Sequence, residues 1–219
     1  MDMDRMAPEN PLPAEDDFPA EERANHEKVH VIACGAIARE ILAVCRQGGL
    51  GHIDLNCLPA IWHAYPQKIV PGLEKAVAEA RAAGFRKIFF AYADCGTGGD
   101  IDRLCEREGI ARIEGPHCYS FFSGNEAFAK TSDDDIFSFF LTDFLARQFE
   151  AFVIEPLGLD RHPELKEMYF GNYRKLVYLS QEEDETLQEK ARAAASYLGL
   201  AYEYRFTGYG DLTQALQSA

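Results

Sequence analysis

Six cysteines are the side chains of this 219-residue chain with the clearest capacity for chemistry. Four of them stand where a short apolar run ends: Cys34 in HVIACG, Cys57 in IDLNCLP, Cys95 in FFAYADCG and Cys118 in IEGPHCYS. A deprotonated thiol at such a place can bind a soft metal or attack an electrophile. The remaining two, Cys45 and Cys105, lie on apolar helical stripes and are expected to be core residues.

Two histidines could supply nitrogen ligands beside these thiols. His63 lies in LPAIWHAYP and His117 directly precedes Cys118. Three thiolates with His63 or a water suit tetrahedral zinc, whereas an all-cysteine set suits an iron–sulfur cluster. No local CxxC spacing is present. The alternatives are that the four cysteines are small buried hydrophobes, or that Cys118 is a nucleophile activated by His117.

The elements that must position these residues are predicted from hydropathy patterning. From Val29 onward, short apolar runs alternate with longer helical stretches, which is typical of an α/β fold with a largely parallel sheet flanked by helices. We expect strands at 29–33, 53–55, 87–92, near 113, and at 136–141, 175–179 and 201–206. We expect a first helix that ends at the glycines 48 and 49. Further helices are expected at 67–83, 100–108, 143–151, 163–169 and 182–198, and near the C-terminus.

A parallel sheet brings the carboxyl ends of its strands to one edge, where open α/β folds place their ligands. The four cysteines should therefore gather at that edge, and Thr142 with Asp143 at a later strand end could face the same crevice. Neighbouring strands are about 4.8 Å apart, so four in a row span roughly 14 Å. Loops must reach inward if the thiolates are to share one metal.

The glycine-rich segment before the helix at 100–108 reads Gly96-Thr97-Gly98-Gly99. It has neither the Walker lysine nor a GxGxxG spacing. We therefore expect a tight turn, with Thr97 or Asp100 capping the helix, rather than a phosphate loop.

Charge and composition bound the organisation and the partners. Residues 1–28 carry nine acids against three bases and four prolines, which predicts a disordered acidic tail. Residues 29–219 should form a single α/β unit, or two packed lobes dividing near residue 130. The formal net charge of −14 argues against nucleic acid and anionic membranes as partners. No run of about 18 apolar residues and no secretory signal is present, so we expect a cytoplasmic protein with reduced thiols.

From about Val29 to the C-terminus the sequence resembles a bacterial and archaeal family known as domain of unknown function 1638. The segments that carry the likeness are VIACGAIARE, LPAIWHAYP, FFAYADCGTGG, GPHCYSFFSG and FFLTDF. The resemblance implies a ligand set of Cys34, His63, Cys95 and Cys118 in preference to Cys57. This chain departs from the family pattern at His117-Cys118, where the family often has an Asp between the two residues. Because genes of the family tend to sit beside corrinoid methyltransferases, corrinoid proteins and their activators, the resemblance also implies a role in demethylating methylated amines or betaines.

The leading hypothesis is thus a metal-binding protein of corrinoid-linked one-carbon metabolism, holding zinc or an iron–sulfur cluster. With zinc it would be a metal-dependent methyltransferase acting on a small methyl donor or acceptor; with a cluster, a redox accessory of a corrinoid protein. The alternatives are a metal-free adaptor that docks a corrinoid protein through its acidic surface, and a cysteine-nucleophile enzyme.

Overall fold

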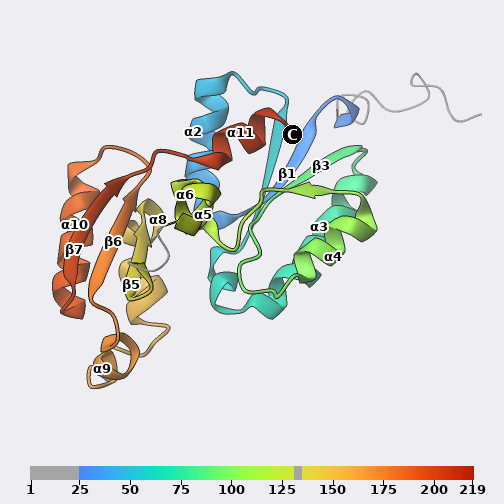
Figure 1. The fold of residues 1–219 in the computed structure, drawn as a ribbon. Helices are drawn as coiled ribbons and strands as arrows, with labels where there is room; N and C mark the ends of the chain where they lie inside the picture. The colour runs from blue at the N-terminus through green and yellow to red at the C-terminus, as the bar shows by residue number, and fades with distance from the viewer. Residues whose placement is uncertain (1–24, 131–134) are drawn as a thin grey trace, which may run out of the picture.

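The computed structural model describes residues 25–130 and 135–219, which fold around two parallel β-sheets (Figure 1). The first sheet has the strand order β2-β1-β3-β4 and the second has the order β5-β6-β7. The predicted α/β class with parallel strands flanked by helices is confirmed, with the strands distributed over two sheets. The strands are β1 (Val29–Cys34), β2 (Ile53–Leu58), β3 (Lys87–Ala91), β4 (Ala111–Arg112), β5 (Ser138–Thr142), β6 (Lys175–Ser180) and β7 (Ala201–Phe206).

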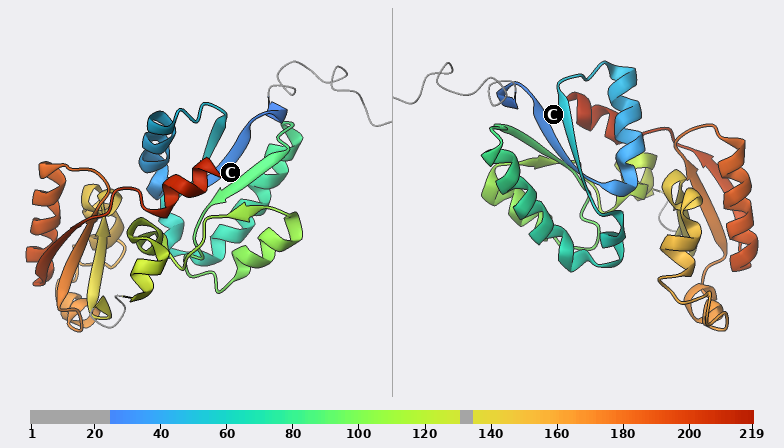
Figure 2. Two further views of the ribbon diagram at one scale, coloured as in Figure 1. Left: turned by 45° about the horizontal axis from the view of Figure 1, so that its top comes forward. Right: turned by 180° about the vertical axis from the view of Figure 1, so that it is seen from behind.

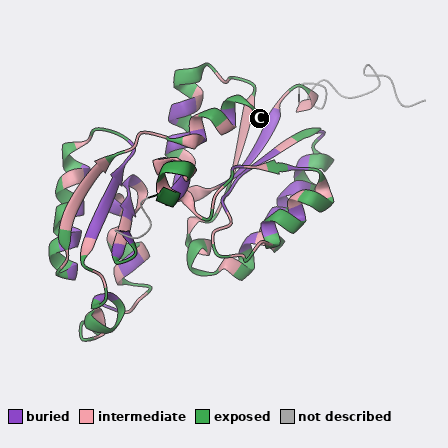
Figure 3. Cartoon of the chain, viewed as in Figure 1, coloured by how far each residue is buried: buried purple, intermediate pink, exposed green. Residues whose placement is uncertain are grey.

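Helices cover both faces of the first sheet because its central strands are apolar on both sides. Val31 and Ala33 of β1 point into one core and Ile32 points into the other, as the period of two in a strand requires. The first core is closed by α2 (Ala38–Gly48) and α5 (Cys118–Ser123), and the second by α3 (Ile69–Ala82) and α4 (Asp100–Glu108). Figure 3 shows the buried centre of this sheet between its exposed outer helical surfaces.

Short elements connect this sheet to its helices. The 3-10 helix η2 (Gly35–Ile37) follows β1 directly and leads into α2. The 3-10 helices η3 (Ala60–Ala64) and η4 (Pro66–Lys68) lie between β2 and α3, and α6 (Asn125–Lys130) follows α5.

The second sheet packs on a separate core formed chiefly by α8 (Asp143–Arg147) and α10 (Glu185–Leu198). The helix expected at 143–151 is divided, since α8 ends at Arg147 and a π-helical turn, η5 (Glu150–Ile154), follows. The last helix of this region is α9 (Leu165–Phe170), which precedes β6. Leu176 and Tyr178 of β6 point into this core and are fully buried.

The C-terminal helix α11 (Asp211–Gln217) returns to the first sheet (Figure 2). It packs against α2 and α5, and its Leu212 and Leu216 are fully buried in the core of that sheet. Gly210 makes the crossing possible, because its φ is +49° and a Cβ there would overlap the carbonyl oxygens of Phe121 and Phe122. We call residues 25–130 together with α11 the N-terminal lobe, and residues 135–206 the C-terminal lobe.

Most of the acidic tail expected at residues 1–28 lies outside the described residues. The described part begins at residue 25, where the side-chain amide of Asn25 donates to the carbonyl oxygen of Ala83 at 2.9 Å. Within the described ranges, no helix has the length and apolar character needed to cross a membrane.

Candidate functional site

The four predicted cysteines all lie in the N-terminal lobe, toward the carboxyl ends of its strands. Cys34 is the last residue of β1, Cys95 lies in the loop after β3, and Cys118 is the first residue of α5. Cys57, expected just after the second strand, is instead inside β2, paired with Ala33, and its side chain is exposed. All six cysteines of the chain are free thiols, and Cys45 and Cys105 pack against the two cores as expected.

Backbone hydrogen bonds bring the loop of Cys95 beside the segment that leads to Cys118. The amide of Asp94 donates to the carbonyl oxygen of Gly115 at 3.0 Å, and that of Cys95 donates to Pro116 at 2.9 Å. Cys95 has a φ of 51°, and no other non-glycine residue in the described ranges has a positive φ. Left-handed backbone is unfavourable for a cysteine, and such strain is concentrated at functional sites.

The thiols of Cys34, Cys95 and Cys118, which we call the thiol cluster, lie close enough to interact electrostatically. Burial, followed by repulsion from Cys34, raises the pKa of Cys95 to about 12. Burial and then Cys95 and Cys34 raise the pKa of Cys118 well above its usual value. Burial also raises the pKa of Cys34. The pKa of Cys57 is raised by burial and then by Cys34, so this thiol lies at the margin of the cluster.

Tyr92, one residue beyond the end of β3, faces the thiol cluster. Its side chain is only 2% exposed, and its pKa is raised by burial and then by Cys34 and Cys95. The hydroxyl has no hydrogen bond of normal geometry with any described residue, but it lies near the Cys34 thiol and lowers the pKa of that thiol. A thiol is a weak acceptor, so this buried donor would interact more strongly with a thiolate.

The two predicted histidines lie near each other. The pKa of His117 is lowered, first by burial and then by the neighbouring His63. His117 precedes α5 and its ring contacts Phe128 edge-on, while His63 lies exposed on η3. The buried Nδ1 atom of His117 has no hydrogen-bond partner among the described residues.

The spacing of these donors is not that of a formed metal centre. In the part of the chain that the structure describes, no group of three or more His, Cys, Asp or Glu side chains is arranged to hold a metal ion. The donor types are those of a soft metal, but their side chains would have to turn toward a common centre to bind one.

The glycine-rich loop after β3 is a tight turn, as expected, but a different residue stabilises it. The carboxylate of Asp94 accepts from the Thr97 hydroxyl at 2.8 Å and from the amides of Gly98 and Gly99 at 3.2 and 2.7 Å. Neither Thr97 nor Asp100 caps α4, which begins after Gly99 without a side-chain cap. Because Asp94 already uses these amides, they are not free for a phosphate.

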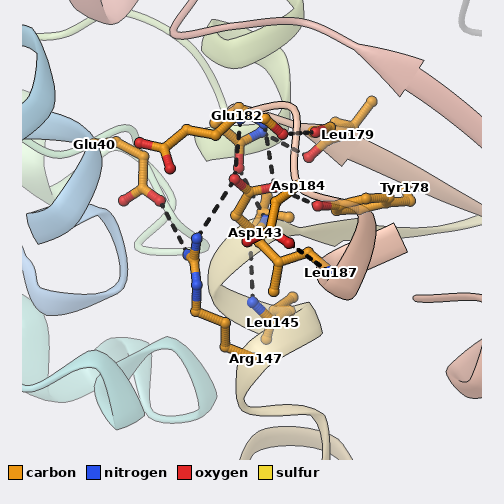
Figure 4. Close-up of polar contacts among 12 residues, drawn as sticks. Glu40, Asp143, Leu145, Arg147, Tyr178, Leu179, Glu182, Asp184 and Leu187 are labelled. Carbon is orange, nitrogen blue, oxygen red and sulfur yellow. Dashed lines mark hydrogen bonds and ion pairs between the residues drawn. The ribbon is translucent and has the colours of Figure 1, made fainter. Parts of the chain in front are cut away.

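A second polar cluster lies between the lobes, at the carboxyl ends of β5 and β6 (Figure 4). Asp143, fully buried at the start of α8, is its centre. Its carboxylate accepts from the Tyr178 hydroxyl at 2.6 Å and from the amides of Gln181 and Glu182 at 3.2 and 3.1 Å. From the sequence, Asp143 is expected to face the same crevice as the thiols. In the structure its carboxylate instead holds the loop after β6 through these hydrogen bonds.

Glu40 of α2 approaches this cluster from the N-terminal lobe. Its Oε1 atom lies 3.9 Å from Nη1 of Arg147, and Nη2 of Arg147 lies 3.8 Å from Asp143 (Figure 4). Glu40 is 4% exposed, and burial is the main reason that its pKa is raised to about 7, with Asp143 and Glu182 adding repulsion.

Sequence reasoning missed Tyr92, Glu40 and Arg147. The available signal for Glu40 was its position on the buried stripe of α2 between Ile37 and Val44, where a carboxylate needs a reason to be present. Arg147 carried no comparable signal, because its partners come from elsewhere in the chain.

Comparison with known proteins gives one result. The model of a family described as "Protein of unknown function (DUF1638)" matches residues 57–216. The match includes His63, Cys95, His117 and Cys118 and begins at Cys57, so that Cys34 precedes it. No curated protein and no solved structure matches the chain.

Proposed function

The chain belongs to the DUF1638 family of proteins of unknown function, and we propose that it is a metal-binding protein whose ligands are the thiolates of Cys34, Cys95 and Cys118. One observation carries this proposal: three partly buried thiols from distant parts of the chain lie close together, so that Cys34 helps to raise the pKa of both Cys95 and Cys118. Burial and repulsion from neighbouring thiols disfavour the thiolate forms of Cys95 and Cys118, and a bound cation would favour those forms instead.

The environment of the cluster supports the same proposal. The Tyr92 hydroxyl, which lies near Cys34, could donate to a metal-bound thiolate sulfur, as outer groups around metal centres commonly do. His63 or Cys57 would complete the ligand set, since His63 lies near the neighbour of Cys118 and Cys57 lies near Cys34. The metal is zinc or an iron–sulfur cluster, because both accept thiolate ligands.

The proposed cellular role comes from the family resemblance. We propose that the protein acts in corrinoid-linked one-carbon metabolism of methylated amines or betaines, with a corrinoid protein or corrinoid methyltransferase as partner. Zinc would supply a Lewis acid for methyl transfer, and a cluster would supply electrons to the partner. In either case the residues of this chain hold the metal and keep water from it, since the thiol cluster is largely buried.

Elemental analysis of anaerobically purified protein tests the proposal. We expect near-stoichiometric zinc or iron in the wild type, and its loss in Cys34→Ser, Cys95→Ser and Cys118→Ser. Cys45→Ser is the matched control, because this cysteine is also partly buried but lies outside the cluster. Wild-type protein that remains metal-free after anaerobic handling and metal supplementation contradicts the proposal.

A second candidate function is a metal-free adaptor that docks a corrinoid protein. The observation that favours it is the spacing of the donors, which do not form a metal centre within the described residues. An adaptor predicts that a chelator leaves the melting temperature unchanged and that the thiols titrate freely in the folded state. The cysteine-nucleophile alternative is disfavoured, because the pKa of Cys118 is raised, opposite to what activation by His117 requires.

A further inference from the structure

A cavity of about 200 Å³ lies between the lobes, beside the carboxylate cluster of Figure 4. One wall is formed by η2 and the first turn of α2, and the other by α8. Its lining includes Arg39 and Glu40 from the N-terminal lobe and Phe144 and Arg147 from the C-terminal lobe. A ligand in this cavity would touch both lobes.

Two of the lining residues carry buried polar atoms without partners. Oε2 of Glu40 and Nη1 of Arg147 make no hydrogen bond with any described residue. The contrast with Asp143 is direct, because that carboxylate is as deeply buried and accepts three hydrogen bonds. A buried carboxylate and a buried guanidinium left open on the wall of a cavity are the arrangement expected where a ligand completes the site.

The charges around the cavity define the ligand. Glu40 is faced by Arg147 and Asp143 from α8, by Glu182 after β6, and by Tyr209, whose hydroxyl donates to Glu182 at 3.0 Å. These carboxylates favour a cation beside Glu40. Arg147, whose Nη1 lies 3.9 Å from Glu40, and the exposed Arg39 of the same lining favour an anion next to it, so the two charges of the ligand must be close together.

We infer that this cavity binds a small zwitterion of the α-amino-acid class, with its ammonium group at Glu40 and its carboxylate at Arg147 and Arg39. At about 30 Å³ for each water in the liquid, the volume is that of about seven waters, which suits a molecule of roughly six to nine non-hydrogen atoms. The ring of Phe144 would contact the apolar part of the ligand. The inference does not depend on whether the thiol cluster holds a metal.

Calorimetric titration of the full-length protein with each of the common amino acids tests the inference. We expect at least one to bind with a Kd between about 10 µM and 10 mM, the range for a ligand of this size. The ligand's analogues that lack either the ammonium or the carboxylate group should bind at least about tenfold more weakly. Absence of binding by the whole panel, or equal binding of either analogue, overturns the inference.

Variants locate the site. Glu40→Gln should weaken binding at least about tenfold, whereas Glu79→Gln, at a side chain 62% exposed on α3, should leave the Kd unchanged. Because the pKa of Glu40 is about 7, the wild type should bind more tightly at about pH 8 than at about pH 6, and Glu40→Gln should lose this dependence. Unchanged affinity in Glu40→Gln contradicts the inference even if an amino acid binds elsewhere.

Discussion

The carboxyl ends of the two sheets carry different chemistry. At the first sheet, three thiols lie close together with a tyrosine hydroxyl that makes no hydrogen bond of normal geometry with the described residues. At the second sheet, Asp143 accepts three hydrogen bonds from its own lobe. We call the edge of the second sheet, where the chain itself supplies these hydrogen bonds, the complete edge, and the edge of the first sheet the incomplete edge.

The difference indicates which edge serves stability and which serves binding. A buried polar group that has all its partners stabilises one conformation, whereas one without partners reduces stability and persists where a ligand compensates. Glu40 and Arg147 are intermediate between these two cases: their charged groups lie 3.9 Å apart across the lobes, but each keeps one buried atom without a hydrogen bond to the described residues.

The largest expected effect is at the complete edge. Asp143→Ala removes the acceptor of Tyr178, Gln181 and Glu182 and leaves two buried donors and one part-buried donor without a partner, so we expect a loss of about 3 kcal/mol in the free energy of unfolding. Urea denaturation measures it. Asp160→Ala is the control, with a side chain 43% exposed, and should change stability by less than about 0.5 kcal/mol. A loss below about 1 kcal/mol for Asp143→Ala would remove the contrast between the edges.

A gain of stability is expected at Glu40. Its pKa is raised from 4.5 to about 7. The stabilisation that the fold gains from the protonated carboxyl group is therefore fully present below about pH 4.5 and is lost as the pH rises through about 7. Glu40→Gln removes this loss and should exceed the wild type by about 2 kcal/mol at pH 8, with little difference at pH 5. Denaturation at the two pH values measures it, and a variant no more stable at pH 8 would show that Arg147 compensates Glu40 fully.

Replacing Asp135, which lies away from both edges, should cause a smaller loss in the free energy of unfolding. Arg205 donates to its carboxylate at 2.5 and 2.8 Å and, with Lys175 at 3.1 Å, lowers the pKa of Asp135 to about 2. A lowered pKa stabilises the fold above about pH 4 and ceases to do so as the pH falls toward 2. Asp135→Asn should therefore cost about 1 kcal/mol at pH 7 and roughly a third of that near pH 2.5, as judged by denaturation. An equal cost at both pH values would indicate that packing, rather than charge, is responsible.

The smallest expected effect is a difference in reactivity between two thiols at the incomplete edge. Cys57 is exposed, whereas the pKa of Cys118 is raised by burial and by its neighbouring thiols. In metal-free native protein Cys57 should be alkylated at least about tenfold faster than Cys118, as followed by peptide mass spectrometry. Urea should abolish the difference, because the two thiols then share one environment. Faster reaction at Cys118 would instead support a nucleophilic role for that residue.

Hydropathy patterning was sufficient for much of the local structure. The strands expected at 29–33, 175–179 and 201–206 and the helix expected at 100–108 agree closely with β1, β6, β7 and α4, because each has an uninterrupted period and a glycine or charged boundary. The helix expected at 143–151 is broken after Arg147, since the chain changes to a π-helical turn that its hydropathy does not encode.

The sequence by itself determined the parallel α/β class and the placement of thiols at the carboxyl ends of strands, because period, strand boundaries and residue type are local properties. Only the tertiary structure decided that the strands divide into two sheets, that α11 returns to the first, and that Tyr92 faces the thiol cluster. It also decided that Glu40 meets Arg147, which lies 107 positions later in the chain (147 − 40). Contacts of this kind depend on how packed elements are oriented, and no periodicity along the chain records that orientation.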